Sequence, residues 1–308
     1  MTKPKNAGPK NIEASVRARL MNIAKETGRP FAEVLQYYGM ERFLYRLSQS
    51  KHAGVFVLKG ALMLKVWKVP EMRVTRDIDF LGRFVNEIAG LENMIKEICC
   101  AEVRQDGLNF DAATVKGERI KEDADYEGVR IKFRGLLGKA RIPMQIDVGF
   151  GDVIFPKPKT IDYPAILDFP QPRLQGYTIE SVVAEKFEAM VKLGTLNSRM
   201  KDFYDIWLMP RQFDFKGEKL AQALCRTFEH RKTALPANPP FFAPEIYDKA
   251  SDRQTLWSAF LRKAEIKHAP TELHDVAKAI EDFLEKPIAF ITGKNETIGV
   301  WTAPGPWK

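Results

Sequence analysis

The stretch Arg73–Leu81 restricts the fold of this chain more than any other feature. It predicts a strand whose side chains alternate, so that Asp77 and Asp79 share one face while Ile78 and Phe80 point into the core. Two residues of strand separate the acids by roughly 6.6 Å of backbone. Carboxylates at that spacing can hold a divalent ion, or flank two ions ~3.5–4 Å apart. Because apolar surroundings make a bare acidic pair costly, a cation is the natural partner. The alternative is a surface strand with two solvated acids.

A second stretch places a turn before this strand. Val55–Leu58 predicts a short buried strand, Gly60 a sharp turn, and Ala61–Trp67 the start of a helix. A strand, a Gly turn and a helix start expose backbone N–H groups that can bind a phosphate. An ordinary strand-to-helix turn is the alternative reading.

The following segment, up to about residue 150, predicts more strands and a third acid. Strands are expected at Leu108–Phe110, Val129–Phe133 and Met144–Val148, and the charged, Gly-bounded segment Lys116–Gly128 is expected to be a hairpin loop. Asp147 faces away from its apolar neighbours in the last of these strands. A carboxylate on an adjacent strand would join Asp77 and Asp79. The alternative is an acid at a strand end near a turn.

The remaining segments predict helices, which makes the chain α+β. The proline-rich segment Val153–Arg173 marks a connection, so two domains are expected, 1–172 and 173–308. Helical periodicity is expected at Asn11–Glu26, Pro30–Leu47, Phe84–Glu102, Ile179–Leu193, Arg199–Leu208, Lys216–Arg231, Asp252–Ile266 and Thr271–Leu284. The tail, Pro287–Lys308, is expected to be an exposed arm or an interface strand.

Two of these helices carry candidate functional charges. Lys186 falls inside the apolar arc of its helix, where an ammonium is costly unless it meets an anion or snorkels to the rim. In the next helix Asp202 flanks the buried stripe, and Asp205 lies opposite that stripe. A salt-bridged surface helix is the alternative there.

Composition and residue spacing exclude several classes of protein. No run approaches the ~20 apolar residues of a membrane span, and residues 1–10, which lack an apolar stretch, are not expected to be a secretory signal. The 3 cysteines include an adjacent pair with no metal-type spacing, so reduced thiols and a cytoplasmic location are expected. The 4 histidines form no ligand cluster with them, so no zinc is expected. The net charge of +8 permits a polyanionic partner such as RNA.

Together these residues resemble the nucleotidyltransferase toxins of the AbiEii/AbiGii type, found in bacterial abortive-infection and toxin–antitoxin systems. The resemblance lies in four motifs that occur in the family's order between positions 54 and 208: Leu58–Leu64, Arg73-x-Thr75-x-Asp77-Ile78-Asp79-Phe80, Glu185-Lys186, and Arg199-x-Lys201-Asp202-x-x-Asp205.

The resemblance implies a nucleotidyltransferase fold of the polymerase-β type, with a mixed sheet followed by a helical C-terminal half. It implies that Asp77 and Asp79 bind Mg²⁺ with a nucleoside triphosphate (NTP), and that Lys186 and Asp202 complete the catalytic site, with Asp205 the second choice. The nucleotide-binding positions would be Lys59, Gly60, Ala61, Arg73, Thr75 and Arg199. Where the family usually has Gly-Ser or Gly-Gly this chain has Gly60-Ala61, so phosphate contact there must come from backbone N–H groups.

Three hypotheses follow from this resemblance. The first is a toxin that transfers nucleotides to RNA, with a tRNA 3′ end as the favoured acceptor, and that a cognate antitoxin restrains. In this scheme Asp147 coordinates a second ion or takes the acceptor's proton. The second hypothesis keeps the fold but modifies a protein or a small molecule. The third is a non-catalytic member that binds RNA or a partner protein.

Overall fold

The computed structural model describes residues 11–69, 74–123, 126–236, 239, 247, 251–294 and 297–308. The chain divides into two compact units. The first comprises Met1–Lys68, Thr75–Gly151 and Lys159–Gly176, and the second Val69–Val74, Asp152–Pro158 and Tyr177–Lys308. Within the described ranges, no helix is both long and apolar enough to cross a bilayer.

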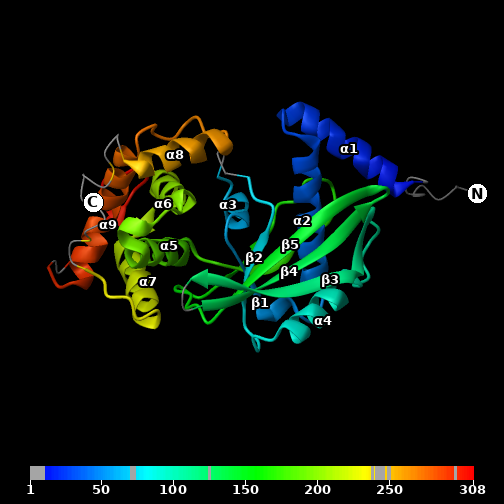
Figure 1. Ribbon diagram of the computed structural model, residues 1–308, viewed down its shortest axis with the longest axis horizontal. Coiled ribbons are helices and arrows are strands. Elements are labelled where there is room, and N and C mark those ends of the chain that lie inside the picture. Colours follow the sequence, from blue (N-terminus) through cyan, green and yellow to red (C-terminus); the bar gives the residue numbers. More distant parts are fainter. Residues whose placement is uncertain are drawn as a thin grey trace, which may run out of the picture. The chain divides into compact units, whose positions relative to one another are not determined.

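The first unit is built on a mixed sheet of 7 strands in the order β3-β4-β5-β2-β1-β7-β6 (Figure 1). The strands are β1 Phe56–Lys59, β2 Ile78–Gly82, β3 Leu108–Asp123, β4 Tyr126–Leu137, β5 Ala140–Phe150, β6 Lys159–Asp162 and β7 Arg173–Gly176. β2 lies between β1, to which it is antiparallel, and β5, to which it is parallel. The parallel pairing aligns Asp79 with Asp147.

The helices of this unit are α1 Ile12–Thr27, α2 Phe31–Gln49, α3 Leu62–Val66 and α4 Ile88–Cys99, with a short 3-10 turn, η1, at Ala53–Val55. The Asn11 side chain caps α1, and Gly28 ends it in a left-handed conformation.

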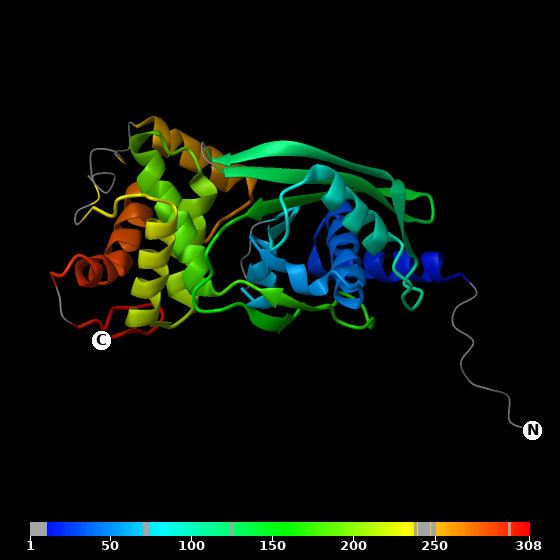
Figure 2. The ribbon, with the colours of Figure 1, turned by 90° about the horizontal axis from the view of Figure 1, so that it is seen from below.

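α2 and α4 lie on the same face of the sheet, as Figure 2 shows from below. Gly39 of α2 packs closely against Ile142 and Met144 of β5, and Ile88 of α4 against Gly117 of β3. The covered face is therefore the one that carries the apolar residues of β5. Because side chains alternate along a strand, Asp147 belongs to the opposite face.

The second unit is mainly helical. Its elements are α5 Ile179–Leu193, η2 Gly194–Leu196, α6 Met200–Gln212, β8 Phe215–Lys216, α7 Gly217–His230, α8 Asp252–Lys263, α9 Leu273–Ile291 and β9 Val300–Trp301. α5 packs on α6 and α7, and α9 packs on α6, α7 and α8. The buried Arg231 binds Asp152 and Glu188 at 2.8 and 2.7 Å, which ties the segment before α5 to this bundle.

The α+β class, the mixed sheet and the helical C-terminal half are confirmed. Every helix expected from periodicity is present, with ends that shift by a few residues. The functional domains 1–172 and 173–308 stay a prediction.

The expected loop at Lys116–Gly128 is wrong. β3 continues to Asp123, and β4 begins at Tyr126. Among the described charges of that segment, Lys116 and Glu118 are exposed on the solvent-facing side of β3.

The expectation for the tail is also wrong. α9 continues through Pro287 to Ile291, and β9 pairs with β8. Trp301 and Trp307 are buried against Phe283, and their ring N–H groups donate to the carbonyls of Pro210 and Phe283. The apolar rings therefore hold this segment on its own unit, despite its Gly and Pro content.

Candidate functional site

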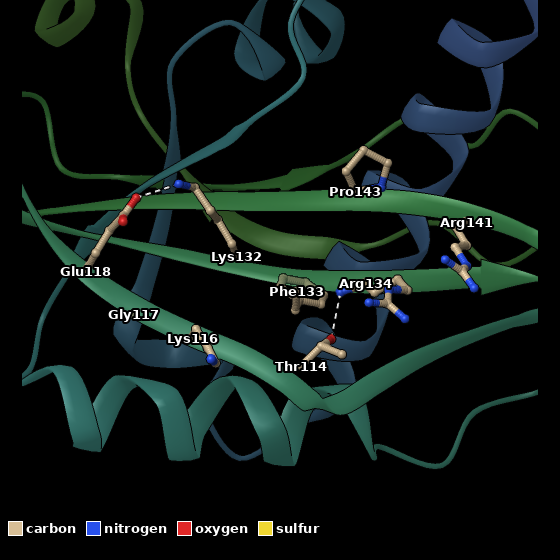
Figure 3. A pocket seen from close by; sticks show the side chains of 9 residues that line it. All are labelled: Thr114, Lys116, Gly117, Glu118, Lys132, Phe133, Arg134, Arg141 and Pro143. Carbon is tan, nitrogen blue, oxygen red and sulfur yellow. Dashed lines mark hydrogen bonds and ion pairs between the residues drawn. The ribbon is translucent and has the colours of Figure 1, made fainter.

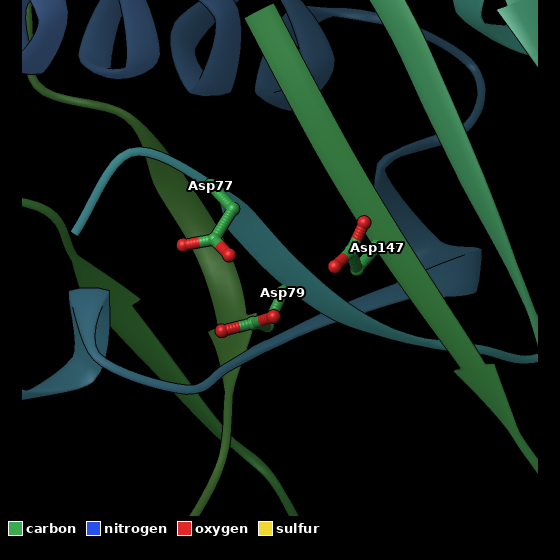
Figure 4. Close-up of side chains that lie close together, drawn as sticks. All are labelled: Asp77, Asp79 and Asp147. Atoms are coloured by element: carbon green, nitrogen blue, oxygen red, sulfur yellow. The ribbon is translucent and has the colours of Figure 1, made fainter. Parts of the chain in front are cut away.

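The strands of the first unit bring three carboxylates together (Figure 4). Asp77 directly precedes β2, Asp79 lies within it, and Asp147 is the register partner of Asp79 on β5. Each of the three offers an oxygen within 4.8 Å of the others. The spacing of two along β2 and the alternation on β5 predicted this shared face.

Gly60 leaves room for the side chain of Asp79. It has φ +71°, and a Cβ added to it would lie 1.9 Å from Asp79 Oδ2. The turn after β1 therefore needs glycine for two reasons: the left-handed backbone, and the space that the carboxylate occupies. The absent Cβ leaves the space that the Asp79 carboxylate fills.

We expect Gly60→Ala to fold, to lose roughly 1–2 kcal/mol in free energy of unfolding from backbone strain, and to lose more through the displacement of Asp79. Gly28→Ala is the matched control, because Gly28 has φ +67° but nothing within 4 Å of an added Cβ. Urea denaturation and Mg²⁺ titration measure the two effects. If both variants lose equal stability and Gly60→Ala keeps its Mg²⁺ response, Gly60 has no part in positioning Asp79.

Thr75 orients the first acid. It is buried, its hydroxyl donates to Asp77 Oδ1, and its backbone N–H donates to the Tyr37 hydroxyl at 3.2 Å. Thr75 is thus a support for Asp77 in this structure. Whether it also binds a nucleotide stays a prediction.

The other predicted nucleotide-binding positions of this unit are less defined. Lys59 ends β1 opposite Asp79. Ala61 is buried and precedes α3, where the N–H groups of Met63 and Leu64 already bond to the carbonyls of Gly60 and Ala61. Arg73 lies outside the described residues.

Arg130 is a site residue that the sequence analysis missed. From β4 it donates two hydrogen bonds to Asp147, of 2.8 and 2.7 Å, and these hold the plane of that carboxylate. The hydrogen bond to Asp147 raises the pKa of Arg130. The contact depends on the β4–β5 register, which pairs Arg130 with Asp147 and which the sequence alone does not fix.

The predicted residues of the helical half form a second cluster, within the second unit. Lys186 of α5 binds Asp202 at 2.6 Å and Asp205 at 2.8 Å, both on α6. The two acids are buried, with 1% and 2% of their side chains exposed. Arg199 adds a 2.7 Å contact from its Nε to Asp202. The inward-facing Lys186 therefore meets anions, as its position predicted.

One orientation in this cluster was predicted wrongly. Asp205 was expected opposite the buried stripe of its helix, but it points at α5 and is buried. A helical wheel orders the residues of one helix and does not show where a neighbouring helix places a cation. The convergence of this cluster with the three acids of the sheet stays a prediction.

The pKa of Asp202 reflects these neighbours. Burial acts to raise the pKa of Asp202, but Lys186 and Arg199 outweigh burial and lower it below its ordinary value. Asp202 is therefore ionised at neutral pH and holds the Lys186 ammonium in place.

The fold and the acid cluster define an α+β protein with a candidate metal site on its sheet. The family described as "Nucleotidyl transferase AbiEii toxin, Type IV TA system" matches residues 42–286. The chain belongs to this family of nucleotidyltransferase toxins, and the resemblance drawn from its motifs is confirmed.

Two solved structures with low identity resemble the chain. One is a protein from H. pylori assigned as a nucleotidyltransferase, which is 16% identical, with 86% of this chain and 96% of that chain covered and a TM-score of 0.44. The other is JHP933 from Helicobacter pylori, 15% identical, with 83% and 90% covered and a TM-score of 0.41. A search of curated proteins found no match.

Proposed function

We propose that this protein transfers a nucleotide from an NTP to an RNA acceptor, with a tRNA 3′ end as the favoured target. The observation that carries the proposal is the cluster of Asp77, Asp79 and Asp147, within 4.8 Å of one another, in a member of a nucleotidyltransferase family. The transfer would block translation, and a cognate antitoxin would restrain it. Both substrates belong to the cytoplasm, where we place the protein.

The donor set fits Mg²⁺. All three side chains offer carboxylate oxygens, the ligands that hard divalent cations prefer, and no His or Cys belongs to the cluster. Like charges this close repel one another, and the Arg130 guanidinium binds only Asp147 among them. A divalent cation bound by these oxygens would offset the repulsion among them.

The chain's own residues would divide the work as follows. Asp77 and Asp79 would serve as metal ligands, the first oriented by Thr75 and the second in the space left by Gly60. When bound, Mg²⁺ would hold the triphosphate and neutralise the charge that develops on its oxygens. Lys186, held by Asp202 and Asp205, would bind the triphosphate as a point charge.

In the reaction an acceptor hydroxyl oxygen bonds to the α-phosphorus, the bond between the α- and β-phosphates breaks, and pyrophosphate leaves. The hydroxyl proton passes to solvent water. Asp147 would be the third ligand, because each of its oxygens keeps a second lone pair beside the hydrogen bond from Arg130. The other role predicted for it, taking that proton, would use one of these lone pairs instead.

Incubation with Mg²⁺, total RNA and NTPs labelled at the α-phosphate tests the proposal. We expect label in RNA, and none from NTPs labelled at the γ-phosphate, because pyrophosphate carries the γ-label away. Asp77→Ala serves as the inactive control. Label that migrates with protein or with small solutes would show that the acceptor is a protein or a small molecule and not RNA. No label anywhere, with Asp77→Ala equally inert, would remove the catalytic proposal.

The toxin part of the proposal has its own test. Expression of the chain in a bacterial host should arrest growth, while Asp79→Ala should not. Co-expression of the adjacent gene should restore growth if that gene encodes the antitoxin. Equal growth arrest by both forms would show that toxicity does not depend on the acid cluster.

A further inference from the structure

The sheet face that carries the acid cluster continues across β4 and β3 as a basic surface. Five cations point from this face and are called here the basic face: Lys116, Arg130, Lys132, Arg134 and Arg141. They alternate with buried apolar residues such as Ile131 and Ile142. All but Arg130 are exposed. The helices α2 and α4 cover the other side of these strands.

The charges of the basic face are poorly balanced. Lys116 lies directly opposite Lys132 in the β3–β4 register, and like charges at such positions destabilise a sheet. Glu118 binds Lys132 at 2.6 Å. Lys116, Arg134 and Arg141 form no ion pair with any residue that the structure describes. This surplus of positive charge would attract an anionic partner.

A pocket hollows the basic face beside an irregularity in β3 (Figure 3). Between Asp111 and Lys116 the register shifts, and the Thr114 hydroxyl accepts from the Arg134 N–H at 3.0 Å. The pocket has a volume of about 530 Å³, and all the cations of the basic face except Arg130 are among the residues that line it.

The basic face is continuous with the cluster of Asp77, Asp79 and Asp147. Arg130 joins the two, because it belongs to the face and binds Asp147. Arg141 lies on the same strand as Asp147, about 20 Å along it at the usual rise per residue. A single triphosphate does not span that length, whereas an extended polyanion does. Phosphates repeated along a chain match cations repeated along strands.

We propose that the basic face binds the phosphate backbone of the RNA acceptor and guides its end toward Asp77, Asp79 and Asp147. This inference rests on the proposed function for its choice of RNA. The contacts are to phosphates, so the face confers affinity and position without reading sequence.

The test compares two neutralised variants of the full chain. The first, Lys116→Gln with Arg134→Gln and Arg141→Gln, removes three cations of the basic face. The control, Lys25→Gln with Arg104→Gln and Lys159→Gln, removes three exposed cations of the same unit outside it. Both lose equal charge. Thermal unfolding checks that both fold, and Arg141→Gln alone serves if the triple variant does not.

Binding of labelled bulk tRNA is measured at several salt concentrations. We expect the basic-face variant to bind at least about tenfold more weakly at low salt, and its slope of log affinity against log salt to fall by about 2, at about 0.7 per lost contact with single strands. The control should match the unaltered chain. Equal losses in both variants, or no loss in either, would overturn the proposal.

Two further measurements separate this inference from the catalytic proposal. Polyglutamate is the second probe, and loss of polyglutamate binding with tRNA binding intact would assign the surface to an acidic protein and overturn the inference. Label transfer to RNA that continues undiminished in the basic-face variant would also overturn it, while leaving catalysis in place. Selective loss of tRNA binding in a chain without transfer activity would support the inference and remove the catalytic proposal.

Discussion

Asp79→Asn is expected to lower nucleotidyl transfer at least about a thousandfold, because the metal that it helps to hold supplies several kcal/mol of transition-state stabilisation. The substitution keeps the shape of the side chain and removes one of three negative charges that lie within 4.8 Å. We therefore expect the metal-free variant to be as stable as the unaltered chain, or more so, since a repulsion is relieved. Its rise in melting temperature on addition of Mg²⁺ should disappear.

These opposite effects distinguish a lost metal site from a misfolded protein. Asp162→Asn is the control, because Asp162 lies on β6 of the same sheet and is not a member of the acid cluster. It should keep both transfer and the Mg²⁺ response. Transfer by Asp79→Asn within tenfold of the unaltered chain would exclude Asp79 from metal binding, and the acid cluster would then need another role.

The acid cluster could be predicted because its geometry follows from local rules. A period of two puts Asp77 and Asp79 on one face, and the apolar neighbours of Asp147 show which way it must point. The turn at Gly60 was predicted too, because glycine is the residue that accepts a positive φ. The sequence does not specify the register between β4 and β5, so the contact between Arg130 and Asp147 was missed.

The errors share one cause, which is that burial depends on partners far along the chain. Charge on Lys116–Gly128 suggested a loop, yet β3 continues to Asp123 and pairs with β4. Asp205 was placed away from the core, yet α5 brings Lys186 to it at 2.8 Å. In the tail, Trp301 and Trp307 pack against Phe283, and no local sequence pattern indicates this contact.

The second large effect is expected at Lys186. Lys186→Met should lower the free energy of unfolding by about 3–5 kcal/mol, the usual cost of removing one partner of a buried ion pair. Asp202 and Asp205 would stay buried without the ammonium that binds both. Lys201→Met is the control, because Lys201 is exposed on the same helix as these acids. Urea denaturation should show little change for it.

The pH dependence of this loss has a defined sign. In the unaltered chain Lys186 and Arg199 outweigh burial and hold the pKa of Asp202 below its ordinary value. Asp202 therefore contributes stability above its unfolded-state pKa, and this is lost as the pH falls through its folded-state pKa. Without Lys186 only Arg199 opposes burial, so the pKa of Asp202 should rise and less stability should be lost as the pH falls. The difference in free energy of unfolding between the unaltered chain and Lys186→Met should then become smaller from pH 7 to pH 4. A difference that grows over this range would contradict the role given to Asp202.

A rescue variant separates the structural role of Lys186 from the catalytic one. Lys186→Met combined with Asp202→Asn and Asp205→Asn leaves no buried charge in the cluster, so most of the lost stability should return. Transfer activity should not return, because the proposed cation for the triphosphate is still missing. If stability and transfer both return, Lys186 serves only to join α5 to α6, and the chemistry must be carried by the first unit alone.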